Sequence, residues 1–504
     1  MVTEIAGAKM LTPFFGASLY SWAATLSITL LALMTGYYSG GYVTTRPGFA
    51  SRDRVVWVFF LSGLAVLMMP GLGSFIMQRT ISLSFFSGLI ISELFFLFLP
   101  VFFMGMISPM VIFQITQKAE QSGRSAGNVY AVSTCGGILF TLVFGFLIIP
   151  YYGISTPVRV LGLLVSAIAL LVLAKEKLSG KKTPASLLLL VVIAAMAFKP
   201  GKPAKNDGQS NMRVVSSSEG LLGELKVIDQ LSFPPNAAPV CIRKLRINNV
   251  AQNYVFRDLP TQSLLYYVNF TRQLLNSFPK KDSVLLIGLG AGSLYKILSD
   301  KYRSVETVEL DKRIYEVGVR YFGMAAHKDH VITDGRYFIN TTGKKYDLLV
   351  LDAIIGENVA AQLTTLESFR RMHAILKNDG MLLVEIGGLA SFSENSFVPS
   401  VLKTLKAAGF QVSMFNPIKS GSLGDVLFVA SKTGFDTRGR YVSTDVQISG
   451  GPLAGYQLSA EQFDNRAAVV LTDDRNYSEV LLKSHHLSVR KSIRKELARY
   501  NFWE

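Results

Sequence analysis

Three acidic residues that follow a glycine-rich turn are the part of this sequence best suited to chemistry. Each of them lies at the end of a predicted strand. The turn contains Gly288, Gly290 and Gly292, and the acidic residues are Glu309, Asp334 and Asp352. Glycines let a backbone approach a ligand closely, and carboxylates accept hydrogen bonds from ribose hydroxyls and an adenine amino group. Together they favour an adenosyl sulfonium ligand.

The spacing of the glycines distinguishes this turn from a dinucleotide fingerprint. Its pattern is G-x-G-x-G, whereas G-x-G-x-x-G would need a glycine at the position of Ser293. Glycine triplets also occur in ordinary turns, and a glutamate at a strand tip can simply be solvated. The succession of three acidic strand ends is what favours a ligand over these alternatives.

Strands that alternate with helices must position these side chains. Apolar segments predict parallel strands at Val284–Ile287, Val305–Leu310, His330–Thr333, Asp347–Leu351 and Met381–Glu385. A closing antiparallel pair is predicted at Gln411–Phe415 and Val426–Ser431. The expected fold is an α/β, doubly wound sheet, in which ligands bind outside the carboxyl ends of the strands. Glu309, Asp334 and Asp352 all fall at that edge.

The composition divides the chain into two parts. Of its 504 residues, 50% are apolar and 17% are charged, with a mean hydropathy of +0.34. Residues 1–200 contain 13 Lys or Arg and 5 Asp or Glu residues, so charge is thin there and ordinary afterwards. This excludes a single soluble globule, a wholly embedded transporter and a disordered chain. The sequence predicts a membrane part joined to a soluble part.

Five apolar runs in the first part are long enough to cross a hydrocarbon core about 30 Å thick. They are Phe14–Tyr37, Val55–Met77, Phe85–Phe113, Val129–Ile149 and Pro157–Ala174. A sixth run, Ala185–Phe198, is short enough to lie at the interface instead. The sequence therefore predicts an N-terminal α-helical transmembrane bundle of five to six segments, with the lipid bilayer as a partner.

The loops of this bundle indicate its orientation. Those after the first, third and fifth runs carry most of the basic residues, which places them in the cytoplasm. Lysines flank both ends of the sixth run, so this rule does not assign a side to the soluble part. We expect the soluble part in the cytoplasm, because its nucleotide chemistry favours that side.

Other polar features of the sequence are less informative. Glu93 is the only acidic residue deep inside an apolar run. A membrane carboxylate is a candidate functional site, but one without an ionic partner is more typical of a hydrogen-bonded group between helices.

No metal site is predicted, because Cys135 and Cys241 lie far apart and the five histidines lack the spacing of metal ligands. The net charge of +16 forms no dense basic stripe, so nucleic acid is not an expected partner.

The expected domain boundaries follow from these segments. The transmembrane bundle covers residues 1–198, and a linker rich in Pro, Gly and Lys covers 199–212. Short strands with intervening turns predict a small β subdomain over 213–275. The nucleotide-binding domain covers 276–485, and a basic C-terminal tail covers 486–504.

Motifs in the soluble part resemble the spermidine synthase (polyamine aminopropyltransferase) family. They are Ile247-Asn-Asn-Val-Ala-Gln252, Val284–Gly292, Val308-Glu-Leu-Asp311, Thr333-Asp-Gly-Arg336 and Tyr346–Asp352. Three further segments resemble the membrane-fused members of this family in bacteria: Gly36–Gly41, Val129–Thr134 and Leu471-Thr-Asp-Asp474. Those relatives begin with one more membrane helix, which leaves open whether this chain starts further upstream.

The resemblance implies a class I methyltransferase-like Rossmann fold and a role for each candidate residue. Asp352 would be the catalytic aspartate. The cosubstrate would be bound by Gln252, by Gly288, Gly290 and Gly292 at its methionine-derived part, by Glu309 at the ribose, and by Asp334 with Gly335 at the adenine. The implied reaction moves an aminopropyl group from decarboxylated S-adenosylmethionine to a small-molecule amine such as putrescine, without a permanently bound cofactor. The implied location is a bacterial inner membrane, and a homodimer is one assembly left open.

Departures from the family pattern fall on the amine side of the site. The family's D-x-x-D-P loop here reads Asp352-Ala-Ile-Ile-Gly356, and the acidic run expected around Tyr266 is absent. Glu357 is a candidate replacement for one lost carboxylate. Three hypotheses follow: an aminopropyltransferase, an S-adenosylmethionine-dependent methyltransferase with a different acceptor, and a non-catalytic membrane protein with a nucleotide-sensing domain.

Overall fold

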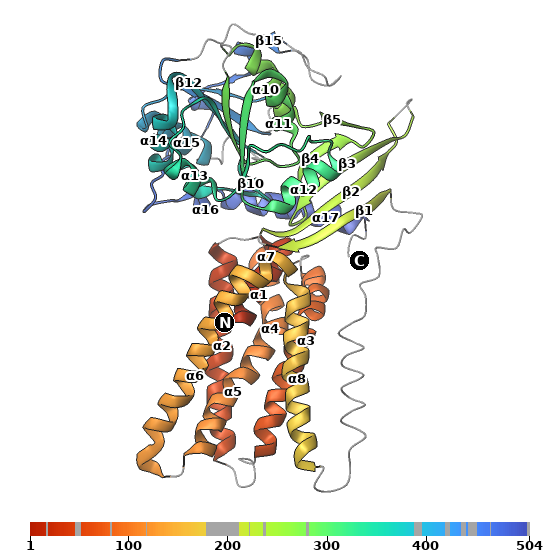
Figure 1. Cartoon of the computed structure of the whole chain (residues 1–504), viewed down its shortest axis with the longest axis vertical. Helices are drawn as coiled ribbons and strands as arrows, with labels where there is room; N and C mark the ends of the chain where they lie inside the picture. The colour runs from red at the N-terminus through yellow and green to blue at the C-terminus, as the bar shows by residue number, and fades with distance from the viewer. Residues whose placement is uncertain are drawn as a thin grey trace. The chain divides into compact units, whose positions relative to one another are not determined.

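A computed structural model of the chain forms two compact units, shown in Figure 1. The first unit comprises Met1–Lys205, Ser218–Glu224 and Asn501–Glu504, and the second comprises Asn206–Ser217 and Leu225–Tyr500. The structure describes all residues except 17–18, 46–51, 81–82, 117, 178–210, 221, 235–237, 279–281, 388–395, 419–423, 435–439, 442–450, 464 and 501–504. The apolar run 185–198 lies outside the described residues.

The described part of the first unit is helical, as its long apolar runs predict. Its helices are α1 (Val2–Phe15), α2 (Leu19–Thr44), α3 (Arg52–Thr80), α4 (Phe85–Phe96), α5 (Phe98–Ile115), η1 (Ala119–Gln121), α6 (Ser122–Val143), η2 (Phe144–Ile148), α7 (Ile149–Tyr152) and α8 (Ser155–Lys177). Helix α3 packs along α8, and α2 packs along α5 (Figure 1). Where α2 and α5 cross, the position of a Cβ on Gly36 would lie 2.4 Å from the carbonyl oxygen of Phe102, so glycine permits this close approach.

Among the residues that the structure describes, four helical stretches are long and apolar enough to cross a membrane. They are Asp53–Thr80, Phe98–Ile115, Ala119–Tyr152 and Ser155–Leu173. The predicted run Phe14–Tyr37 is not among them. It is divided at Gly16, where α1 ends with φ +79°, and its larger part forms the 26-residue helix α2. The predicted run Phe85–Phe113 divides at Leu97 into a short α4 and a longer α5.

Glu93 lies in α4 with its side chain fully buried. Its Oε1 accepts a hydrogen bond from Thr25 Oγ1 of α2 at 2.5 Å. The hydrogen bond joins α4 to α2. This agrees with the prediction that Glu93 is a hydrogen-bonded group between helices.

The small β subdomain is a five-stranded antiparallel sheet in sequence order. Its strands are β1 (Met212–Gly220), β2 (Gly223–Ser232), β3 (Val240–Ile247), β4 (Val250–Phe256) and β5 (Leu259–Ser263). Asn248 and Asn249 make the β3–β4 turn with φ of +52° and +66°, which asparagine tolerates better than most residues.

The larger sheet has eight strands in the order β17-β13-β14-β12-β9-β6-β7-β8. The strands are β6 (Ser283–Ile287), β7 (Ser304–Glu309), β8 (His330–Ile332), β9 (Tyr346–Leu351), β12 (Leu376–Ile386), β13 (Gln411–Phe415), β14 (Val426–Ser431) and β17 (Gln457–Leu458). Strands β12, β9, β6, β7 and β8 are parallel, and β14 and β13 are antiparallel to their neighbours. This confirms the predicted Rossmann-like sheet.

Helices cover both faces of this sheet (Figure 1). One face packs against α10 (Tyr266–Asn276), α11 (Ser293–Lys301) and α12 (Lys312–Tyr321). The opposite face packs against α13 (Gly335–Thr341), α14 (Leu366–Ile375) and α15 (Phe397–Ala407). The strands between them are almost continuously apolar, as expected for parallel strands buried on both sides.

Short elements and a last helix complete the second unit. They are β10 (Ile354–Ile355), β11 (Asn358–Val359), η3 (Ala361–Leu363), β15 (Arg440–Tyr441), β16 (Gly451–Pro452), η4 (Leu453–Tyr456), η5 (Ala460–Gln462), α16 (Ser478–Leu481) and α17 (Lys483–Tyr500). The segment predicted as a basic tail from residue 486 therefore forms most of α17, and its Arg490 is buried in the domain.

Candidate active site

The glycine-rich turn lies where the order of strands reverses direction. The chain passes from β6 outward to β7 and β8, then returns to β9 on the other side of β6. Gly288, Gly290 and Gly292 follow β6 with φ of +87°, +52° and +81°. A Cβ on Gly288 would lie 1.9 Å from the carbonyl oxygen of Asp352, which follows β9. Glycine thus brings the ends of β6 and β9 into contact at the crevice where such sheets bind ligands.

Glu309 ends β7 with its carboxylate turned toward the glycine turn. Its Oε2 accepts a hydrogen bond from the backbone N–H of Leu289, and Oε1 accepts one from Asp311, both at 3.0 Å. Burial raises the pKa of Glu309 to about 7, although the two backbone hydrogen bonds favour the charged form. The group is placed next to the turn as a ribose acceptor must be, and its protonation changes near neutral pH.

Asp334 and Gly335 form the N-terminus of α13, beyond β8. The Asp334 side chain caps the helix by accepting a hydrogen bond from the backbone N–H of Tyr337 at 2.9 Å. A Cβ on Gly335 would lie 2.7 Å from Cγ2 of Ile287 at the end of β6. This pair therefore lies at the same edge of the sheet as the glycine turn, although capping already engages one oxygen of Asp334.

Asp352 follows β9, and its backbone carbonyl lies against Gly288 of the turn. The phenol of Tyr267 in α10 donates a hydrogen bond to its Oδ2 at 3.0 Å. Burial is the main cause that raises the pKa of Asp352 above the usual range of an aspartate. A carboxylate with a raised pKa is a stronger base and can accept a proton at neutral pH.

The structure gives Glu357 a different function from the one expected. Both of its oxygens accept hydrogen bonds from the guanidinium of Arg490 in α17, with Nε to Oε1 at 2.8 Å, and both side chains are buried. This pair fixes the β10–β11 hairpin, so Glu357 is not available to replace a lost amine-side carboxylate. Gln252 contacts the same hairpin, because its Nε2 donates to the carbonyl oxygen of Gly356 at 3.0 Å.

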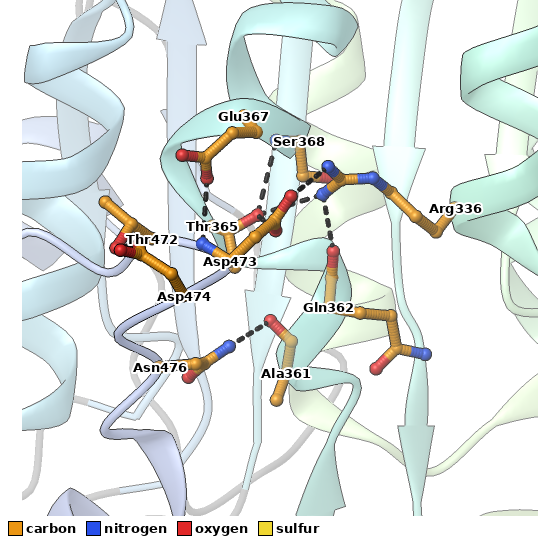
Figure 2. Close-up of polar contacts among 10 residues, drawn as sticks. All are labelled: Arg336, Ala361, Gln362, Thr365, Glu367, Ser368, Thr472, Asp473, Asp474 and Asn476. Carbon is orange, nitrogen blue, oxygen red and sulfur yellow. Dashed lines mark hydrogen bonds and ion pairs between the residues drawn. The ribbon is translucent and has the colours of Figure 1, made fainter.

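A second group of polar contacts fixes the segment that leads into α14 (Figure 2). Asp473, in the motif Leu471-Thr-Asp-Asp474, accepts hydrogen bonds from Arg336 Nη2 at 2.6 Å and from Thr365 Oγ1 at 2.7 Å. Its backbone N–H donates to Glu367 at 3.0 Å, and Asn476 donates to the carbonyl oxygen of Ala361 at 2.8 Å. The C-terminal motif therefore fastens residues 361–367 to α13.

Three residues at this edge of the sheet escape sequence reasoning. They are Tyr267, Glu385 at the end of β12, and Asp425 just before β14. Tyr267 directly follows Tyr266, the tyrosine around which the family's acidic run was expected. The sequence did contain a signal for Glu385. This residue ends β12 as Glu309 ends β7, so a carboxylate at the end of every predicted strand was a usable criterion.

Part of the second unit is similar to known proteins. Residues 270–423 match the model of the spermine/spermidine synthase domain. The polyamine aminopropyltransferase of Vibrio vulnificus is 34% identical over 124 residues, or 23% of this chain and 42% of that protein. That of Saccharolobus islandicus is 33% identical over 156 residues, or 28% of this chain and 50% of that protein. The chain thus spans half or less of the length of these curated relatives. The spermidine synthase structure from Thermotoga maritima aligns with 57% of this chain and 88% of its own, with a TM-score of 0.32 and 17% identity.

Gly288→Ala tests the contact between the ends of β6 and β9. The new methyl group would overlap the Asp352 carbonyl in a backbone conformation that alanine rarely adopts. We expect the free energy of unfolding of the second unit to fall by about 2–5 kcal/mol, measured by thermal unfolding of the full chain in detergent. Gly343→Ala is the matched control, since no atom lies within 4 Å of its Cβ position. Equal stability of the two variants would contradict the contact.

The raised pKa of Glu309 predicts pH-dependent nucleotide binding. If ribose hydroxyls donate to its carboxylate, ligand binding requires the ionised form, which predominates only above a pKa of about 7. The affinity for 5′-methylthioadenosine, measured by calorimetry, should rise about tenfold from pH 6 to pH 8. Glu309→Gln should bind weakly and without this dependence, whereas Asp352→Asn should retain it. Wild-type affinity that is constant over this range would remove Glu309 from the ribose site.

Proposed function

We propose that the protein is a membrane-anchored aminopropyltransferase, because residues 270–423 match the model of the spermine/spermidine synthase domain. The observation that carries the proposal is the position of Asp352. Its carboxyl group is held by Tyr267, and its backbone contacts the glycine turn at the reversal of strand order. The donor is proposed to be decarboxylated S-adenosylmethionine, and the acceptor a small amine.

The chemistry requires a base at this position, because an ammonium group has no free electron pair. The acceptor nitrogen gives a proton to the Asp352 carboxylate, and its electron pair then attacks the propyl carbon bonded to the sulfonium sulfur. The new C–N bond forms as the C–S bond breaks, and the bonding pair remains on sulfur as a neutral thioether. The products are the alkylated amine and methylthioadenosine.

The residues of the site divide between binding and proton transfer. We assign the donor nucleoside to the glycine turn, Glu309 and Asp334 with Gly335. Binding both substrates next to each other in a partly buried crevice lowers the entropic barrier to their reaction. Gln252 is assigned to the hairpin that borders the site, because its amide bonds to the backbone of Gly356.

Asp352→Asn tests the proton acceptor and the reaction together. The full chain in lipid nanodiscs is incubated with putrescine and either decarboxylated or intact S-adenosylmethionine, and products are identified by mass spectrometry. We expect spermidine and methylthioadenosine from the decarboxylated donor. Because the amide is not a base, Asp352→Asn should reduce kcat by about 10²–10⁴-fold and leave the affinity for methylthioadenosine within twofold.

Three outcomes would contradict this proposal or a part of it. Accumulation of S-adenosylhomocysteine without spermidine would favour the methyltransferase hypothesis, for which the absence of the family's second loop aspartate is the supporting observation. Unchanged turnover in Asp352→Asn would remove this residue from catalysis. Nucleotide binding without any product from either donor would favour the sensing hypothesis.

The proposal also includes a location in a bacterial cell membrane, with the second unit in the cytoplasm. Its test is Glu316→Cys in a Cys135→Ser background, since Glu316 is exposed on α12, whereas the native Cys241 is buried. A membrane-impermeant maleimide should label the new thiol only after cells are permeabilised. Labelling in intact cells would place this unit outside the cytoplasm.

A further inference from the structure

The described part of the first unit contains one fully buried carboxyl group, and the proposed reaction does not use it. Glu93 lies in α4, and its Oε1 contacts Thr25 Oγ1 of α2 at 2.5 Å. Its Oε2 is also buried and has no hydrogen-bond partner among the described residues. A buried carboxylate that is so poorly satisfied is costly, and within a membrane such a group is a candidate binding site.

Buried hydroxyl groups follow one face of α2 beside this carboxyl. Ser21, Thr25 and Thr29 are spaced four residues apart, which places them one above another on the helix, and all three are buried. Thr25 Oγ1 lies 2.9 Å from the carbonyl oxygen of Ser21, the usual arrangement for a hydroxyl inside a helix. The Thr29 hydroxyl has no hydrogen-bond partner among the described residues. The face of α2 next to Glu93 is therefore polar over two turns.

The contacts of Thr25 depend on whether Glu93 carries a proton. Thr25 Oγ1 lies close to two oxygens, the Ser21 carbonyl and Glu93 Oε1, but a hydroxyl has one proton and a carbonyl has none. When Glu93 is ionised, Thr25 can donate to only one of the two. When Glu93 is protonated, it donates to Thr25 and Thr25 donates to Ser21. The protonated state therefore makes both contacts hydrogen bonds.

Charged side chains do not compensate for an ionised Glu93. Helix α4 packs against α1, α2, α3 and α5. The charged residues among their described side chains are Glu4, Lys9, Asp53, Arg54 and Arg79. Helix α2 adds Tyr20, Tyr37, Tyr38 and Tyr42. None of these described groups bonds to Glu93, so the packed helices favour its neutral form.

We propose that Glu93 is a proton-binding site in the first unit and that Thr25 positions it. The protonated carboxyl bonds α4 to α2. When the O–H bond breaks and the proton passes to water, one of the two contacts of Thr25 loses its hydrogen bond and a charge remains in apolar surroundings. Proton release thus weakens the contact between α2 and α4. This activity goes beyond anchoring and does not depend on the reaction proposed for the second unit.

Dicyclohexylcarbodiimide tests the site, because it reacts with carboxyl groups that are protonated and lie in apolar surroundings. The carboxyl proton moves to a carbodiimide nitrogen, the carboxyl oxygen bonds to the carbodiimide carbon, and the adduct rearranges to a stable N-acylurea. The full chain in nanodiscs is treated between pH 6 and pH 9, and the adduct is mapped by peptide mass spectrometry. Glu93 should be modified, at a rate that falls about tenfold or more across this range as the carboxyl ionises.

Variants separate a titrating site from a purely structural hydrogen bond. Thr25→Val removes the one hydrogen bond that stabilises the ionised carboxylate, so modification should persist to a pH about one to two units higher. Thr35→Val is the matched control on the same helix, since Thr35 Oγ1 bonds to backbone carbonyls of α2, and it should leave the pH profile unchanged. Glu93→Gln should abolish the adduct, and Glu120, exposed in η1, should stay unmodified.

A sodium series provides the second arm, because a carboxyl group beside hydroxyls can also bind Na⁺. Replacing choline chloride with sodium chloride at constant pH should leave the rate of modification of Glu93 unchanged. Protection by sodium overturns the proton assignment in favour of a sodium site.

Three further outcomes overturn the inference. They are absence of the adduct at pH 6, a rate that is constant from pH 6 to pH 9, and an identical pH profile in Thr25→Val. If Thr25→Val does not fold, the wild-type pH profile and the sodium series decide the question. Formation of spermidine affects none of these measurements, so failure of this inference and failure of the proposed function are distinguishable.

Discussion

The close approach of the ends of β6 and β9 is the constraint on which the rest of the site depends. Any side chain at position 288 would collide with the backbone of Asp352. The ends of β6 and β9 can therefore lie this close together only with a glycine at that position. The same contact sets the position of the Asp352 carboxyl, which Tyr267 then holds from α10. Reversal of the strand order at this point opens the crevice in which a nucleoside can meet that carboxyl. One backbone contact therefore places the binding turn and the proposed base together.

Carboxyl groups without cations dominate this crevice, and their desolvation determines what it can bind. Glu309, Asp352 and Glu385 all have raised pKa values because burial disfavours their charged forms. Elsewhere in the same domain, buried acids are paired: Glu357 with Arg490, and Asp347 with Lys377 at 2.8 Å. The contrast separates acids that hold the fold from acids that await a ligand. A sulfonium donor and a polyamine acceptor would both bring positive charge to the second group, which is the electrostatic basis of the function proposed.

The sequence predicts much of this fold because the local pattern of most segments agrees with the element that each segment forms. Parallel strands buried on both faces are read from continuous apolar segments, and β6, β7 and β9 lie within a residue or two of their predicted bounds. The predicted run Phe14–Tyr37 is divided at Gly16 between the end of α1 and the long helix α2, a break that the apolar average of the run did not reveal. The partners of Asp352 could not be predicted, since Tyr267 is 85 residues away and only packing of α10 brings its phenol there. Likewise Glu357 looked like a free carboxylate, because its arginine lies 133 residues later.

The C-terminal segments explain how this chain holds its acceptor side without the family's loop motif. Between Asp352 and α14 the backbone forms the β10–β11 hairpin and η3, and two distant segments fix it. Arg490 neutralises Glu357 under the hairpin, while Asp473 joins Arg336 to Thr365 at the other end (Figure 2). The hairpin and η3 are thus held at both ends by ion pairs and hydrogen bonds. In this arrangement the segment has a structural role and does not need to supply a carboxylate to a ligand. Glu385, by contrast, lies on the rigid end of β12, where its position is set by the register with β9 and β14. Placing charged groups on strands instead of a loop reduces the conformational entropy lost when the ligand binds.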